Sequence, residues 1–163
     1  MDPVYDILQR RIRDARRLAI VGIGDELMPP DRLGMFAARE IGEDQIPGVR
    51  IFLAGTVPES ITGPLRRYRP GHVIFLDAAD MGVKPGTIAL VEPERIRAGL
   101  ITTHVLPLSV VMDYIEREIG AGVTLLGIQP DLAVPGRDLS DGDLAYLGRN
   151  LQSLSQVLRD RQV

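Results

Sequence analysis

The chain has 163 residues, a length that predicts a single compact domain at about 100 to 200 residues per domain. Hydrophobic residues make up 45% of it and charged residues 25%, which excludes the composition of a disordered chain. The formal net charge of −3 argues against nucleic acid as a partner, while the absence of cysteine excludes disulfides and thiolate metal sites and favours a cytoplasmic location.

The N-terminal segment 2–17 is predicted to form a helix, because Asp2-Pro3 suits a helix start and apolar residues then recur at helical spacing. A short, continuous apolar run at 18–23 predicts a strand that is buried on both faces. Asp31 is placed to cap the next helix, which is expected to end at Gly42. Apolar runs of this length are far too short for insertion into a membrane, which needs about 18 to 20 residues.

Two further apolar runs, at 49–54 and 72–76, predict a second and a third strand. The segment 58–68 between them is predicted to be a helix weakened by Gly63-Pro64. The third strand is the most hydrophobic of the three and is expected to deliver Asp77 at its C-terminal end.

After a Lys-Pro-Gly turn, the segment 87–91 predicts a strand that runs locally antiparallel to its neighbours. A helical turn is expected at 93–99 and a helix with one apolar stripe at 107–119. A buried strand at 123–128 and a leucine-striped helix from about 141 to 160 complete the series.

Alternating strands and helices of this kind predict a single-domain α/β fold with three layers, αβα, around a mostly parallel, partly mixed central sheet. The N-terminal helix 2–17 and the final helix would flank a core at 18–131.

The chemically interesting side chains are acids that follow the predicted strands, because ligands of an open parallel sheet bind beyond the carboxyl ends of its strands. These acids are Asp25, Glu26, Asp31, Asp77 and Asp80. His104, in a predicted loop, could reach the same edge. Two carboxylates and one imidazole would make a three-ligand site for a divalent ion such as nickel or zinc.

Purely structural roles are the alternative. Asp31 could serve only as a helix cap, Asp77 could bond a neighbouring loop, and His104 could be a satisfied polar residue. His72, at the head of a strand, favours a structural role.

The motif Gly22-Ile-Gly24 resembles the start of a dinucleotide-binding turn, but Leu27 stands where the third glycine belongs and no P-loop lysine follows. Glycines that permit a tight turn are the favoured interpretation.

Three motifs make the chain recognisable. They are Phe75-Leu-Asp-Ala-Ala-Asp-Met-Gly-Val-Lys-Pro-Gly86, Ile101-Thr-Thr-His-Val-Leu-Pro-Leu108 and Leu126-Gly-Ile-Gln-Pro-Asp131. In this order they closely resemble the [NiFe]-hydrogenase maturation endopeptidases, above all the branch that processes the large subunit of formate-hydrogenlyase-type hydrogenases, also called hydrogenase 3. The resemblance extends from about residue 18 to residue 131.

The resemblance implies a three-layer α/β endopeptidase that removes the C-terminal extension of a hydrogenase large-subunit precursor after nickel insertion. It assigns Asp31, Asp77 and His104 as the catalytic and metal-contacting residues. The metal would be nickel supplied by the substrate, although zinc or another divalent ion could occupy the site. The implied partner is the nickel-loaded precursor.

The first motif departs from the family pattern at Asp25, Pro30 and Arg32, where asparagine, an acid and glycine are usual. This altered loop keeps open a second hypothesis, a non-catalytic, nickel-dependent binding or chaperone module for the large subunit. A small-molecule or nucleotide-binding domain is a third, carried only by the glycine turn.

Overall fold

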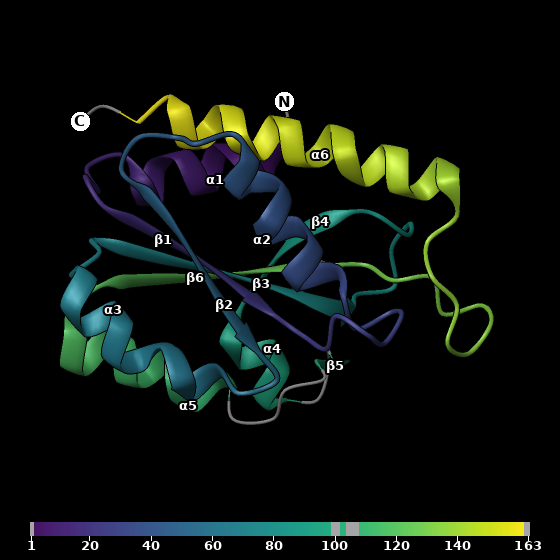
Figure 1. Cartoon of the computed structure of the whole chain (residues 1–163), viewed down its shortest axis with the longest axis horizontal. Helices are drawn as coiled ribbons and strands as arrows, with labels where there is room; N and C mark the ends of the chain where they lie inside the picture. The colour runs from purple at the N-terminus through teal and green to yellow at the C-terminus, as the bar shows by residue number, and fades with distance from the viewer. Residues whose placement is uncertain (1, 99–101, 104–107, 162–163) are drawn as a thin grey trace.

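The computed structural model describes residues 2–98, 102–103 and 108–161 (Figure 1). A central sheet has the strand order β2-β1-β3-β6-β4, in which β4 alone runs antiparallel to its neighbour. The strands are β1 (Leu18–Ile23), β2 (Val49–Gly55), β3 (His72–Asp80), β4 (Ile88–Val91) and β6 (Gly122–Ile128). The mostly parallel, mixed sheet and the antiparallel strand predicted at 87–91 are both confirmed.

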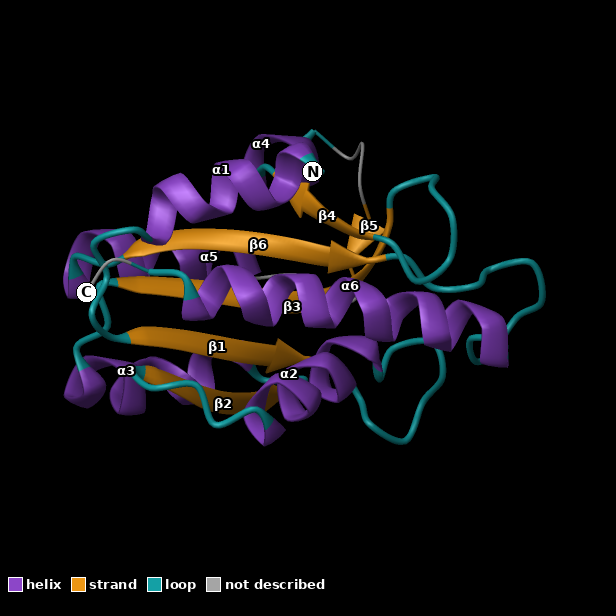
Figure 2. Ribbon diagram, turned by 90° about the horizontal axis from the view of Figure 1, so that it is seen from above, coloured by secondary structure: helices purple, strands orange, loops and turns teal. Residues whose placement is uncertain are grey.

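Helices cover both faces of this sheet, so the predicted three-layer fold is also confirmed (Figures 1 and 2). One face carries α1 (Pro3–Ile12), α2 (Leu33–Glu43) and α6 (Asp141–Arg159). The other face carries the 3-10 turn η1 (Pro58–Ile61), α3 (Thr62–Tyr68), the short α4 (Pro93–Arg97), and α5 (Leu108–Tyr114) with its π-helical continuation η2 (Ile115–Ile119).

The leucine stripe predicted for the last helix does pack α6 onto the sheet. Its buried members include Leu147, Leu151, Leu154 and Leu158. Each such side chain stabilises the fold by about 1.5 to 3 kcal/mol relative to exposure. Ser140 caps the helix, since its hydroxyl accepts a hydrogen bond of 3.1 Å from the Asp143 N–H.

The helix predicted at 2–17 is too long, whereas the helix predicted at 58–68 has the right bounds but is divided. The helix predicted at 2–17 ends at Ile12, because the chain must turn there to enter β1, and Arg17 already accepts a backbone hydrogen bond from the Gly71 N–H. The helix predicted at 58–68 is divided into η1 and α3. Pro64 falls in the first turn of α3, where a missing N–H is tolerated.

Strand β3 continues to Asp80, four residues beyond its predicted end at 76. Its last residues are held by hydrogen-bonded neighbours: Ala78 pairs with Ile128 of β6, and Ala79 pairs with Thr103 of β5 (Thr102–Thr103). Asp77 is therefore an interior strand residue and does not follow the strand.

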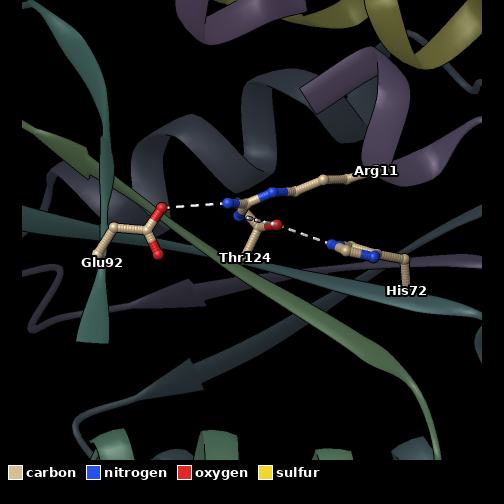
Figure 3. Close-up of polar contacts among 4 residues, drawn as sticks. All are labelled: Arg11, His72, Glu92 and Thr124. Atoms are coloured by element: carbon tan, nitrogen blue, oxygen red, sulfur yellow. Dashed lines mark hydrogen bonds and ion pairs between the residues drawn. The ribbon is translucent and has the colours of Figure 1, made fainter. Parts of the chain in front are cut away.

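A polar network connects α1 to the sheet at the end where β3 and β6 begin (Figure 3). His72 is buried, and its Nε2 lies 2.8 Å from the Thr124 hydroxyl oxygen. Arg11 donates to the same oxygen at 3.2 Å and to a Glu92 carboxylate oxygen at 3.1 Å. His72 thus has the structural role favoured from its position in the sequence.

Within the described ranges, no helix has both the length and the apolar character required to cross a membrane.

Candidate active site

The candidate site lies where β1 and β3 part at their carboxyl ends. The chain leaves β1 through α2 on one face of the sheet, whereas after β3 it continues to α5 on the other face. Such a divergence opens the crevice in which open α/β sheets bind ligands. The loops that follow β1, β3 and β6 all project from this end of the sheet (Figure 2).

Asp77 lies near the carboxyl end of β3 with 1% of its surface exposed. Neither of its carboxylate oxygens has a hydrogen-bond partner among the described residues. The Ala78 N–H is near enough to favour the charged form but falls short of hydrogen-bond geometry. Since buried polar groups are normally paired, a buried carboxylate that has no partner among the described residues indicates a functional group.

Asp31 approaches Asp77 from the β1–α2 loop because two glycines allow a close fit. A Cβ on Gly24 would lie 2.0 Å from the Asp31 carbonyl oxygen, and a Cβ on Gly34 would lie 2.2 Å from that of Leu76. Gly34 thereby allows the close helix packing that the third glycine of a dinucleotide-binding turn, replaced here by Leu27, would provide. Gly24 has a φ of 127°, as expected of a glycine that permits the tight turn favoured from the sequence.

The charge of Asp31 is near enough to influence the pKa of the Asp77 carboxyl. Burial raises the pKa of the Asp77 carboxyl to about 7, the Ala78 N–H opposes the shift, and the negative charge of Asp31 adds to it. The N-cap residue of α2 is Arg32, whose side chain makes no capping hydrogen bond. The prediction that Asp31 caps this helix is therefore wrong. Two of the three predicted ligands are thus brought together.

His104 lies outside the described residues, and its assignment as a ligand stays a prediction. The described chain nevertheless reaches the site just before it. Thr103 of β5 pairs with Ala79, two residues after Asp77 on β3.

The remaining acids at this edge are engaged elsewhere. Asp25 accepts a 2.9 Å hydrogen bond from the Leu27 N–H, as in an Asx turn, and Glu26 forms two 2.7 Å bonds with Arg39. Asp80 accepts a hydrogen bond of 3.2 Å from the Gly82 N–H. These three carboxylates therefore stabilise loops.

Sequence reasoning quoted Gln129 in a family motif but gave no role to this residue, which joins the loops after β3 and β6. It is buried, its Oε1 accepts a 2.6 Å hydrogen bond from the Met81 N–H, and its Nε2 donates to an Asp80 carboxylate oxygen at 3.3 Å. The available signal was an amide side chain directly after a strand of apolar residues, at the edge where ligands bind.

No cluster of three or more metal-binding side chains occurs within the part of the chain that the structure describes. The acid pair is present there, and the third predicted member is His104.

The chain is similar to proteins of one family. The sequence profile described as hydrogenase maturation protease matches residues 37–141. The hydrogenase 3 maturation protease of Escherichia coli is 32% identical over 111 residues, 68% of this chain and 70% of that protein. A Methanocaldococcus jannaschii protein assigned as a hydrogenase maturation protease is 30% identical over 135 residues, 78% of this chain and 80% of that protein.

Solved structures agree with this result. The [NiFe] hydrogenase maturation protease HycI of Thermococcus kodakarensis superposes with a TM-score of 0.80 at 27% identity, covering 94% of this chain and 99% of that one. This chain belongs to the hydrogenase maturation protease family and is a peptidase.

Proposed function

We propose that this peptidase removes the C-terminal extension of a [NiFe]-hydrogenase large-subunit precursor of the hydrogenase 3 type, after nickel has been inserted, and that it does so in the cytoplasm. Family membership and the name of the E. coli relative support the substrate class. The observation that carries the site is Asp77, a buried carboxylate with no hydrogen-bond partner among the described residues, beside Asp31.

The ligand set proposed here is Asp31, Asp77 and His104, which contact the nickel that the precursor carries. Carboxylate oxygens and an imidazole nitrogen suit a borderline divalent ion, and zinc accepts the same donors. An ion held there would polarise the carbonyl of the scissile peptide bond and stabilise the developing oxyanion. Because the ion arrives with the substrate, only a loaded precursor completes the site, which gives discrimination against unloaded precursor.

The carboxyl groups have a role of their own in moving protons. Before nickel is bound, a pKa of about 7 lets Asp77 hold or release a proton at neutral pH, as a general acid or base requires. Asp31 can serve as the base in its place.

The test is to incubate the protein with nickel-loaded and nickel-free precursor and to follow the C-terminal extension by mass spectrometry. Cleavage is expected only of the loaded precursor, and it should be lost in Asp31→Asn, Asp77→Asn and His104→Ala. Asp25→Asn is the matched control, since asparagine keeps the hydrogen bond to the Leu27 N–H at the same edge. Undiminished cleavage by His104→Ala would reject the ligand assignment.

The same assay separates the non-catalytic alternative, which requires tight binding of the loaded precursor with no loss of mass over many hours. The altered loop that motivated this alternative still brings Asp31 beside Asp77. Family membership favours cleavage.

A further inference from the structure

Two loops flank the strand that carries Asp77. Strands β1 and β6 are the two neighbours of β3, and the loops that follow them span residues 24–32 and 129–140. Arg32 of the first loop and Asp138 of the second, 106 residues apart, form an ion pair that joins the two loops. The Asp138 Oδ2 lies 2.9 Å from Nε and 2.8 Å from Nη2 of Arg32.

Both partners of this ion pair are themselves fixed. Arg32 is the N-cap residue of α2, and its guanidinium carbon lies 5.1 Å from the ring centroid of Phe36. The second oxygen of Asp138 accepts a 2.9 Å hydrogen bond from the N–H of Leu139, whose side chain is buried in the core. The pair therefore connects two anchored points and fixes the β6–α6 loop relative to Asp31.

The two connected loops present apolar side chains to solvent. On the β1–α2 loop these are Leu27, 88% exposed, and Met28, 54% exposed; on the β6–α6 loop they are Leu132 and Val134, each 49% exposed. Exposed apolar groups on the loops that follow the strands on either side of β3 are suited to contact with a partner. At a peptidase site that partner is the polypeptide substrate.

We propose that Arg32 is a positioning residue for the peptidase reaction. Through Asp138 it holds the β6–α6 loop against the β1–α2 loop, so that the apolar side chains of both loops contact an apolar stretch of the substrate chain next to the scissile bond. This inference rests on the proposed function. A loop that is already held in place loses less conformational entropy on binding than a mobile loop does. The ion pair therefore strengthens substrate binding.

Kinetics on a nickel-loaded large-subunit precursor of the hydrogenase 3 type tests this role. In Arg32→Ala and Asp138→Asn, KM should rise about 5-fold, with kcat changed less than about 2-fold. The KM of Arg32→Lys, which keeps the charge, should lie between the KM of these variants and that of the wild type. The charge-reversed pair Arg32→Asp with Asp138→Arg should recover part of the loss. In the substrate-free protein, amide exchange across 131–139 should accelerate in Arg32→Ala.

Arg159→Ala is the matched control, because it removes a 3.7 Å ion pair that joins the last residue of α6 to Asp44 at the C-terminal end of α2, away from the two loops. Its KM should equal that of the wild type. An unchanged KM in Arg32→Ala and Asp138→Asn, an equal rise in Arg159→Ala, or a loss confined to kcat would overturn the proposal. If the wild type does not cut the precursor, the proposed function fails, and this inference fails with it; if the wild type cuts and the variants match it, only the positioning role fails.

Discussion

Acidification should destabilise the protein through His72, the buried histidine at the end of the sheet remote from the candidate site (Figure 3). The Thr124 hydroxyl oxygen already accepts a hydrogen bond from Arg11 and lies 2.8 Å from His72 Nε2. The Thr124 hydroxyl proton is therefore free to be donated to Nε2 of the neutral His72 imidazole. Protonation would place a second donor against the same oxygen and a second positive charge near Arg11.

The size of the effect follows from the pKa of His72. Burial, with the positive charge of Arg11 as the second cause, lowers this pKa from 6.5 to about 4. Between these values the unfolded chain binds the proton and the folded chain does not, so stability is lost as the pH falls from 6.5 through 4. The difference of two to three pH units corresponds to about 3 kcal/mol of unfolding free energy.

Urea unfolding followed by circular dichroism at pH 7.5 and at pH 4, with wild type and His72→Gln, isolates this contribution. Glutamine offers an acceptor oxygen and does not titrate, so the other acids affect both proteins alike. The wild type should lose about 3 kcal/mol more than the variant between the two pH values. Parallel losses in the two proteins would refute the reasoning.

The remaining predictions concern the site and its supports. Gly34→Ala should destabilise the fold by about 2 kcal/mol or more and abolish cleavage, because its Cβ would lie 2.2 Å from the Leu76 carbonyl oxygen and displace the start of α2. Gly148→Ala, whose Cβ would meet nothing within 4 Å in α6, should stabilise by about 1 kcal/mol; thermal melts compare the two, and equal effects would contradict the packing argument. Asp77→Asn should abolish cleavage yet raise the melting temperature by about 4 to 8 °C at pH 7.5 in the presence of chelator. The reason is that burying the Asp77 charge costs about 4 kcal/mol of folding free energy, which is more than the cost of leaving a buried amide unpaired. A lower melting temperature for this variant would show that the charge is not destabilising.

Much of this architecture can be predicted from local patterns in the sequence. Continuous apolar runs such as 18–23 are buried on both faces of the sheet, and the leucine stripe of the last helix packs as its spacing predicts. Periodicity reports which face of an element is apolar, and that face must be buried whatever its partner is. The motifs around Asp77 and His104 likewise named the family, because they depend on residue identity and order alone.

Long-range contacts decided the rest. Strand β3 extends past Asp77 only because β5 and β6 supply hydrogen-bond partners, and this burial is what raises the pKa of the acid. The pairing of Arg32 with Asp138 joins residues 106 positions apart, and no local pattern signals it. Sequence determined which side chains are available for chemistry, whereas the packing of distant segments determined which of them meet and how far water is excluded, since those properties depend on neighbours in space.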